Sequence, residues 1–456
     1  MSDKIQNKPK ILLIKPPFYR LMKSHFNGLD LGLAYIAAVL DKNGFYTRLY
    51  NADYVEEGIL PSLEELFQNY NFYKEIINNR QHEIWEEIKN KIKNFNPDIV
   101  GISMFTGAYK SAKIVAQLAK EINPEIKVVI GGPHSTLSPQ ETLIKNNEFD
   151  YAIRGEGEYT FLELVQDCPL EEIKGLSYKK GNEIIHNQER EFIKDLDSLP
   201  FPARNLFLER GRNLNLGNIA TGRGCPYACR FCASPKLWKR IARLRSSDNV
   251  LDELEEVVKK YNQKSISFVD DTFTLNRERT KEICKKIIDR KLGIEWRCDT
   301  RADRLDEELI SLMKEAGCIC VRIGVESGSE RVLRLMQKNE KKEDIRKAAV
   351  LIKKHGISLT AYFMAGFPGE TNEDLRETID FAKEIEADYY SLGIVSPYYG
   401  TDIYFMLKEQ GKLKNEEDWE YFFHQSYKGM EYNKNLDPKL VEEFLSLNKY
   451  AKGKRI

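Results

Sequence analysis

The sequence has 456 residues, which suggests two or three domains. It is 42% hydrophobic and 31% charged, too apolar for a disordered chain. Because 70 basic residues balance 70 acidic ones, no net charge attracts nucleic acid or an anionic membrane. The polar start MSDKIQNKPK predicts no secretory signal, and the longest apolar run, LGLAYIAAVL, is too short to cross a bilayer. We therefore expect a cytoplasmic protein with no transmembrane segment and no nucleic-acid partner.

The first part of the chain, residues 1–160, has the pattern of one α/β domain. Short apolar runs alternate with helical periodicity, and strands are expected at 11–14, 47–52, 98–103, 127–132 and 151–155. Continuous apolar strands separated by helices predict a parallel sheet covered on both faces. Residues 55–96 are expected to form a helical insertion, and 161–215 a linker that contains a β-hairpin turning at Lys180-Gly181-Asn182.

Unusual residues follow the strands of this domain, at the edge where open α/β sheets bind ligands. Paired glycines there allow a ligand to approach the backbone closely, although glycine pairs also make ordinary tight turns. Neither the phosphate-loop nor the dinucleotide fingerprint is present, so neither ATP nor NAD is indicated. The candidate ligand contacts at this edge are Lys15, Pro16, Ser103, Thr106, Gly131, Gly132, Pro133, Gly155 and Glu156.

From residue 217 the alternation resumes with six strand–helix units. The expected strands are 217–222, 265–270, 294–299, 320–326, 358–366 and 390–396. Six sequential units over residues 216–404 predict a partial, TIM-like (β/α)6 barrel, whose site lies in the loops at the carboxyl ends of the strands. Residues 405–456 are expected to form a short helical tail.

The loop after the first barrel strand, RGCPYACRFC, places Cys225, Cys229 and Cys232 at C-x3-C-x2-C spacing. Three thiolates on one loop can hold three irons of a cubane cluster and leave the fourth iron open for a ligand. The alternative is zinc, but structural zinc takes four ligands and no fourth Cys or His lies near this loop. The other five cysteines are expected to pack as small apolar residues.

This loop closely resembles the cluster loop of radical S-adenosylmethionine (SAM) enzymes, and the resemblance extends over nearly the whole chain. It implies that the three cysteines bind a 4Fe-4S cluster whose unique iron takes the amino and carboxylate groups of SAM. An electron from an external donor, such as flavodoxin or ferredoxin, then cleaves SAM to give a 5′-deoxyadenosyl radical.

The same resemblance implies SAM contacts at the strand ends of the barrel. Taken alone, each acidic residue among them would equally suit a helix cap or a salt bridge. For Glu326, the alternative is an ion pair with a base such as Arg301 or Arg322. No residue is singled out as catalytic. The implied SAM contacts are Phe231, Asp270, Asp271, Asp299, Arg301, Glu326 and Ser327.

The first domain resembles the flavodoxin-like cobalamin-binding domain of class B radical SAM methyltransferases. The resemblance rests on the strand ending KPP, the helix LGLAYIAAVL, the Gly-Gly-Pro-His strand end and the RGEGE junction. The histidine of the D-x-H-x-x-G motif, which ligates cobalt in many such domains, is absent. Leu29 stands in its place, and His25 is out of register. Since related domains lack this histidine, we expect cobalamin to bind without a protein ligand to cobalt.

The resemblance predicts a cobalamin-dependent radical SAM methyltransferase that methylates an unactivated carbon of a small-molecule or lipid-like substrate through the 5′-deoxyadenosyl radical and methylcobalamin. The alternative is a radical SAM cyclase, ring-rearranging or carbon–carbon coupling enzyme that transfers no methyl group. A tRNA methylthiotransferase would need three cysteines in the first domain, and none precedes Cys168. A cobalamin carrier or a zinc-scaffolded interaction protein is the non-enzymatic alternative.

Overall fold

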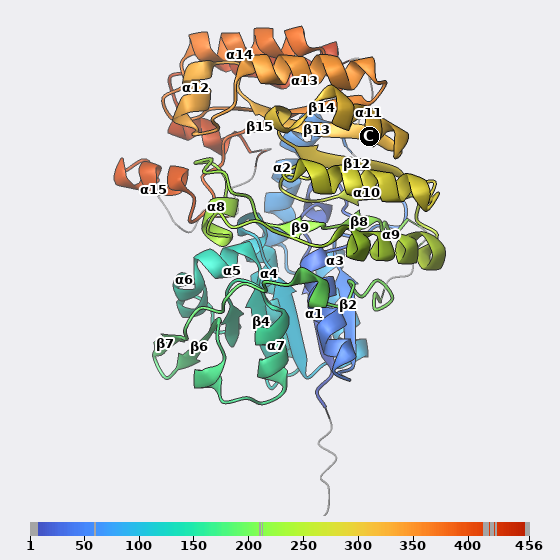
Figure 1. Ribbon diagram of the computed structural model, residues 1–456. Helices are drawn as coiled ribbons and strands as arrows, with labels where there is room; N and C mark the ends of the chain where they lie inside the picture. Colours follow the sequence, from blue (N-terminus) through green and yellow to red (C-terminus); the bar gives the residue numbers. More distant parts are fainter. Residues whose placement is uncertain are drawn as a thin grey trace, which may run out of the picture. The chain divides into compact units, whose positions relative to one another are not determined.

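The computed structural model describes residues 8–58, 61–208, 211, 213–413, 419, 424 and 426–451. The chain divides into two compact units, which are described separately (Figure 1). The first comprises Met1–Pro61 and Gln68–Asn215, and the second comprises Ser62–Phe67 and Leu216–Ile456. Across the described ranges, every helix falls short of the length and apolar character that a membrane span requires.

The first unit is built on a seven-stranded sheet of order β2-β1-β3-β4-β5-β6-β7. The first five strands pair in parallel, and their 2-1-3-4-5 order is that of flavodoxin-like folds, as predicted. The hairpin expected in the linker adds β6 and β7 to the edge of this sheet as antiparallel strands. The strands are β1 (Ile11–Lys15), β2 (Thr47–Asn51), β3 (Ile99–Ser103), β4 (Lys127–Gly131), β5 (Tyr151–Ile153), β6 (Leu176–Lys180) and β7 (Glu183–His186).

The helices of the first unit bury one apolar face each. In α3, for example, Ile84, Ile88 and Ile92 are buried at a spacing of four residues. Helix α1 packs on α7, and α3 packs on α4. The insertion between β2 and β3 forms α2 and α3, as predicted. The helices are α1 (Leu31–Lys42), α2 (Leu63–Asn78), of which the residues up to Phe67 are assigned to the second unit, α3 (Glu83–Phe95), α4 (Tyr109–Ile122), α5 (Pro133–Leu137), α6 (Pro139–Ile144) and α7 (Glu158–Val165).

The second unit is an open barrel of six parallel strands in the order β15-β14-β13-β12-β11-β8, as the strand–helix pattern predicted. Along β12, Trp296 and Cys298 are fully buried against the helices, whereas Arg297 and Asp299 are partly exposed on the other side. We call this other side the inner face of the barrel. The strands are β8 (Asn218–Ile219), β11 (Ser265–Phe268), β12 (Glu295–Thr300), β13 (Cys318–Glu326), β14 (Ser358–Ala365) and β15 (Tyr389–Ile394).

Helices connect and cover the barrel strands, and the segment after β15 belongs to the same core. The predicted tail is helical where it is described, and residues 414–418, 420–423, 425 and 452–456 of it lie outside the described residues. Phe444 and Leu447 are buried in the barrel core. The predicted domain boundaries themselves stay predictions. The helices of this unit are α8 (Ser234–Leu237), α9 (Ser247–Tyr261), α10 (Arg277–Asp289), α11 (Glu307–Glu315), α12 (Glu330–Leu335), α13 (Lys342–Lys354), α14 (Asn372–Ile385), α15 (Asp402–Glu409) and α16 (Pro438–Leu445).

Candidate active site

The three-cysteine loop spans residues 224–242 and is closed at its base by a short antiparallel pair. Strand β9 (Gly222–Arg223) pairs with β10 (Arg243–Leu244). Gly224 begins the loop at φ +89°, and a Cβ at this position would lie 2.2 Å from the carbonyl oxygen of Ile241. Glycine is therefore required where the loop leaves the sheet.

The loop backbone is fixed by the segments around it. The amide of Arg230 donates to the carbonyl of Met336 (3.0 Å), and the amide of Ile403 donates to the carbonyl of Arg230 (3.1 Å). These bonds hold the segment between Cys229 and Cys232 from two sides. The cysteines themselves are partly exposed and unpaired by disulfides. The loop thus presents its sulfur atoms without using them to hold its own fold.

The donor set of this loop fits an iron–sulfur cluster. Burial raises the pKa of all three thiols, that of Cys232 to about 12, so they are protonated until a metal displaces the protons. Among the described residues, no three His, Cys, Asp or Glu side chains converge to hold a single metal ion. A cubane does not need such convergence, because each of its three ligated irons takes one thiolate.

Glu326, the last residue of β13, adopts an uncommon backbone conformation at the rim of the barrel. Its φ is +69°, and the register between β13 and β14 shifts between Gly324 and Glu326. A left-handed conformation costs a non-glycine residue roughly 1–2 kcal/mol, and such residues gather at functional sites. Glu326 itself therefore makes the turn at the end of β13. Its side chain is 8% exposed.

The base that faces Glu326 is Lys338, which sequence analysis did not single out. The Lys338 Nζ lies 3.4 Å from Oε1 of Glu326 and 3.5 Å from Oε2 of Glu340. All three side chains are buried. Burial raises the pKa of Glu326, and the nearby Lys338 ammonium opposes that rise. The same ammonium opposes the rise that burial causes in the pKa of Cys229, so this charged group adjoins the cysteine loop.

Arg301 also reaches the loop, but it does not pair with Glu326. Its guanidinium lies 3.9 Å above the ring of Tyr227 and donates to the carbonyl of Lys338 (3.0 Å) and to Asp303 (2.9 Å). Arg301 therefore ties the residue that faces Glu326 to an aromatic ring within the cysteine loop. Tyr227 and Lys338 are the two additions that the structure makes to the predicted site.

The two acids after β11 point to different partners. Asp271 accepts a hydrogen bond from the hydroxyl of Ser234 (2.7 Å), two residues beyond Cys232. Asp270 accepts from the amide (3.1 Å) and hydroxyl (2.9 Å) of Thr221, and burial raises its pKa to about 6. Asp271 thus adjoins the cluster loop, whereas Asp270 fixes the end of the first barrel strand.

Two other predicted SAM contacts have their partners outside the loop. The Ser327 hydroxyl is 2.9 Å from that of Thr378 on α14, and the Ser327 side chain is fully buried there. Asp299 lies on the inner face and forms an ion pair with Arg322 (2.6 Å). Phe231 lies within the loop and is partly exposed. The structure therefore brings Phe231, Asp271, Arg301 and Glu326 to the cysteine loop, and contact of any of the predicted residues with SAM stays a prediction.

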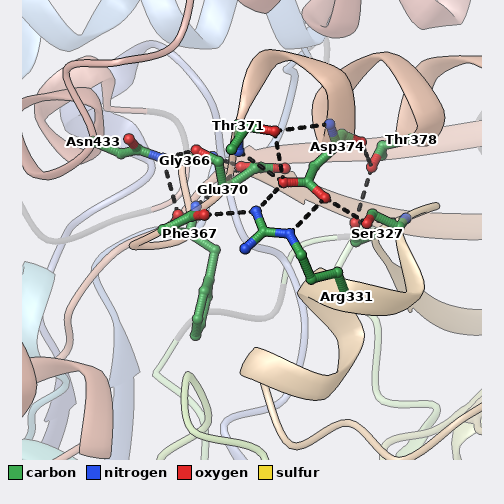
Figure 2. Close-up of polar contacts among 11 residues, drawn as sticks. Ser327, Arg331, Gly366, Phe367, Glu370, Thr371, Asp374, Thr378 and Asn433 are labelled. Atoms are coloured by element: carbon green, nitrogen blue, oxygen red, sulfur yellow. Dashed lines mark hydrogen bonds and ion pairs between the residues drawn. The ribbon is translucent and has the colours of Figure 1, made fainter.

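The loop after β14 is held by a buried carboxyl group (Figure 2). Oε2 of Glu370 accepts hydrogen bonds from the amides of Gly366 (2.6 Å) and Phe367 (3.2 Å). The side-chain amide of Asn433 donates to the carbonyls of Phe367 (3.0 Å) and Glu370 (2.9 Å). Next to this loop, Asp374 caps α14 and pairs with Arg331.

Replacing Glu370 with glutamine should flatten the pH dependence of stability. Burial raises the pKa of Glu370 from 4.5 to about 8. Between these values the unfolded chain releases a proton that the folded chain keeps, so stability falls as pH rises. Glutamine accepts the same two hydrogen bonds without ionising. We expect the free energy of unfolding of Glu370→Gln, relative to that of wild type, to increase between pH 5 and pH 8 by on the order of a few kcal/mol.

Urea unfolding at both pH values, with the cluster reconstituted, measures this difference. The matched control is Glu377→Gln, an exposed carboxylate on the same helix. Parallel pH profiles for wild type and Glu370→Gln would contradict the assignment of a protonated carboxyl group to this position.

In the first unit, part of the predicted cobalamin edge is open. A Cβ added to Gly131 or to Gly155 would meet no atom within 4 Å. Ser103, at the end of β3, is partly exposed, and Pro133 is exposed. These residues leave room for a ligand beside the backbone, as a bound cobalamin requires.

The other predicted residues of this edge have partners within the fold, and their contact with cobalamin stays a prediction. A Cβ on Gly132 would lie 2.8 Å from the carbonyl oxygen of Met104, so this glycine permits backbone packing. Glu156 accepts from the amide of Ile193 (2.8 Å), and the Thr106 hydroxyl is 3.3 Å from Nδ1 of His134.

Lys15 and its neighbours complete this buried part of the edge. The Lys15 ammonium forms an ion pair with Asp53 (2.8 Å) and lies over the rings of Tyr19 and Phe26, and Pro16 is buried. Leu29, where the cobalt-ligating histidine is expected, is 2% exposed.

Comparison with known proteins identifies the family of this chain. Residues 219–382 match the model of the Radical SAM superfamily, and residues 20–165 match that of the B12 binding domain. An uncharacterized methyltransferase of Pyrococcus horikoshii is 35% identical over 404 residues, which cover 87% of this chain and 82% of that protein. The chain belongs to the radical SAM superfamily. Its cofactors are a 4Fe-4S cluster, SAM and cobalamin, and the non-enzymatic alternative is excluded.

Other relatives of this radical SAM enzyme include an anaerobic magnesium-protoporphyrin IX monomethyl ester cyclase of Rubrivivax gelatinosus. It is 30% identical over 339 residues, which cover 70% of this chain and 60% of the cyclase. Among solved structures, the radical SAM methyltransferase TsrM from Kitasatospora setae superposes with a TM-score of 0.70 at 18% identity, over 88% of this chain and 76% of TsrM. The cobalamin-dependent radical SAM enzyme OxsB gives 0.64 at 20% identity, over 91% and 56%. These likenesses confirm the predicted two-part fold.

Proposed function

We propose that this enzyme transfers a methyl group to an unactivated carbon of a small-molecule or lipid-like substrate. The observation that carries the proposal is that one chain combines a B12 binding domain with an accessible three-cysteine loop, in a sequence 35% identical to a methyltransferase. When bound, the cofactors supply a carbon-centred radical and the methyl group. The electron that begins the reaction comes from an external donor such as flavodoxin or ferredoxin.

The residues at the barrel rim complement the charges of SAM. Cys225, Cys229 and Cys232 hold the cluster. Beside them, the Glu326 carboxylate offers acceptors for an amino group or ribose hydroxyls, and the Lys338 ammonium offers a partner for a carboxylate. Because these groups are buried, their interactions with a charged ligand are stronger than they would be in water. Arg301 keeps Lys338 in position through the Lys338 carbonyl.

Label transfer from SAM tests the proposed function. With SAM that carries a trideuterated methyl group, we expect a product heavier than the substrate by one labelled methyl, formed only with cobalamin present. The candidate substrates come from metabolites that accumulate when the gene is deleted. A product that contains no SAM-derived methyl group would overturn the proposal in favour of a cyclase or rearranging enzyme, the activity named for the relative from Rubrivivax gelatinosus.

Cobalamin should bind without a protein ligand to cobalt, because a buried leucine stands at position 29. Electron paramagnetic resonance of the cob(II)alamin form in nitrogen-15-labelled protein tests this expectation, since only a protein nitrogen then gives a doublet splitting. We expect no such doublet in wild type. The variant Leu29→His serves as the matched control in which a doublet is expected. A protein-derived doublet in the wild-type spectrum would contradict the expectation.

A further inference from the structure

The inner face of the barrel is polar, unlike the interior of a closed barrel. Closed TIM barrels fill their interiors with branched apolar side chains. Here most of the side chains that alternate with the helix-facing core near the middle of the strands are polar or charged, and several of them are partly exposed. Such a surface stays hydrated or meets a polar ligand. The described inner-face residues at the middle of the strands are Ser267, Arg297, Asp299, Arg322 and Tyr362.

One carboxylate on this face already has its partners. Oδ2 of Asp299 accepts from Nη2 of Arg322 (2.6 Å), and Oδ1 accepts from the hydroxyl of Tyr362 (3.0 Å). The same Nη2 lies 3.3 Å from the hydroxyl of Ser267. Asp299 therefore balances one positive charge, that of Arg322.

The second positive charge on this face has no carboxylate partner. Arg297 donates from Nη2 to the hydroxyl of Ser265 (3.0 Å), and no acidic side chain of the described residues lies within 4 Å of its guanidinium. Glu295, two residues earlier on the same strand, is exposed and beyond that distance. Nε of Arg297 and Nε of Arg322 are both buried and have no acceptor among the described residues.

Two neighbouring cations with one balancing anion form an incomplete charge set. Burial, followed by the proximity of Arg322, lowers the pKa of Arg297, and the more distant carboxylate of Glu295 opposes this only in part. The two guanidinium groups are therefore close enough to repel one another. A buried donor without an acceptor costs about 1–3 kcal/mol. An incoming anion would supply both the missing charge and acceptors for the two Nε atoms.

We propose that the inner face of the barrel binds an anionic group of the substrate, a carboxylate or a phosphate, between the guanidinium groups of Arg297 and Arg322. The inference rests on the proposed function in one respect, namely that the substrate binds inside the barrel. Guanidinium groups present paired donors that match the oxygens of carboxylates and phosphates.

The position of these arginines also bears on the depth at which the anionic group binds. Arg322 precedes Glu326 by four residues on β13, which corresponds to about 13 Å at the rise of a strand. Glu326 lies at the level of the cysteine loop. The anionic group is therefore bound about four residues of β13 away from the level of the cysteine loop, deeper in the barrel.

Anion binding to the full-length, cluster-reconstituted enzyme tests the proposal. Inorganic phosphate and acetate are the probes, titrated at constant ionic strength against chloride, and the thermal midpoint reports binding. We expect a saturable rise in wild type with at least one probe, and an affinity at least tenfold weaker in Arg297→Gln and Arg322→Gln. The tighter probe assigns a phosphate or a carboxylate group. Arg334→Gln, an exposed arginine on α12, is the matched control that binds as wild type does.

The Arg297→Gln variant keeps the test decisive, because Arg297 forms no ion pair whose loss would unfold the barrel. Its iron content and its midpoint without anion show that it is folded and loaded. Wild type without a saturable shift for either probe, or Arg297→Gln with wild-type affinity, would overturn the proposal. Failure of the proposed function is a separate outcome: anion binding that depends on Arg297 stands even if the product contains no methyl group from SAM.

Discussion

Replacing Cys225, Cys229 and Cys232 together with alanine is expected to abolish iron binding and SAM cleavage while the fold remains intact. The base of the loop is held by β9 and β10, and its middle by the backbone of Arg230. The thiols are partly exposed, so their loss leaves no cavity in the core. The hydrogen bonds lost are weak ones to sulfur, from the amide of Ser234 to Cys232 (3.4 Å) and between Cys225 and the hydroxyl of Thr272 (4.0 Å).

Anaerobic reconstitution followed by iron analysis measures the effect, and circular dichroism and the thermal midpoint check the fold. Cys168→Ala is the matched control, because Cys168 is also partly exposed and lies in the first unit. This control should keep its iron. About four irons per chain in the triple variant would contradict the assignment of the three cysteines as cluster ligands, since a single cubane needs these thiolates.

Replacing Glu326 with glutamine is expected to weaken SAM binding roughly ten- to a hundredfold and to leave the cluster in place. Charge-assisted hydrogen bonds contribute about 1.5–3 kcal/mol each, and each 1.4 kcal/mol corresponds to a factor of about ten in the dissociation constant. The fold should tolerate the change, because Lys338 keeps Glu340 as a partner at 3.5 Å.

The dissociation constant of SAM and the thermal midpoint are to be measured on the same reconstituted samples. Lys338→Met and the double variant complete a mutant cycle that separates the ion pair from the contact with SAM. Glu330→Gln, on the exposed side of α12, is the control for loss of a carboxylate alone. Unchanged affinity together with a lowered midpoint would remove Glu326 from the binding site and leave it a structural partner of Lys338.

Most strands could be predicted from local sequence patterns. The pairing of the linker hairpin with the first sheet could not. The strands of both units were predicted because buried parallel strands are continuous apolar runs. The turn at Gly181-Asn182 also has a local signature, and β6 and β7 flank it as predicted. What no local pattern indicates is that β6 pairs with β5, with Tyr178 opposite Tyr151. That pairing places the hairpin in the first sheet.

In the candidate site, too, residues that are close in sequence were predictable, and residues that only the fold brings together were not. The cysteine loop was predictable because its ligands lie within eight residues of one another. Lys338 was not, because it reaches Glu326 only through an irregular connection between α12 and α13 in which Gln337 and Asn339 are left-handed. Ser327 was grouped with Glu326 as its neighbour in sequence. The strand ends in a left-handed turn at Glu326, so Glu326 meets Lys338 at the rim whereas Ser327 meets Thr378 of α14.

The contact between Asn433 and the loop after β14 has a consequence for the order of folding during synthesis. Asn433 and the buried Phe444 and Leu447 are made after every strand of the barrel. All strands of the first sheet end by His186, so that sheet can form while the ribosome is still adding the barrel. In the barrel, by contrast, the carbonyl groups of Phe367 and Glu370 gain their hydrogen-bond donor only after Asn433 has been synthesised. Until then the barrel lacks part of its apolar core, and exposed apolar surface of this kind makes a partly folded chain prone to aggregate.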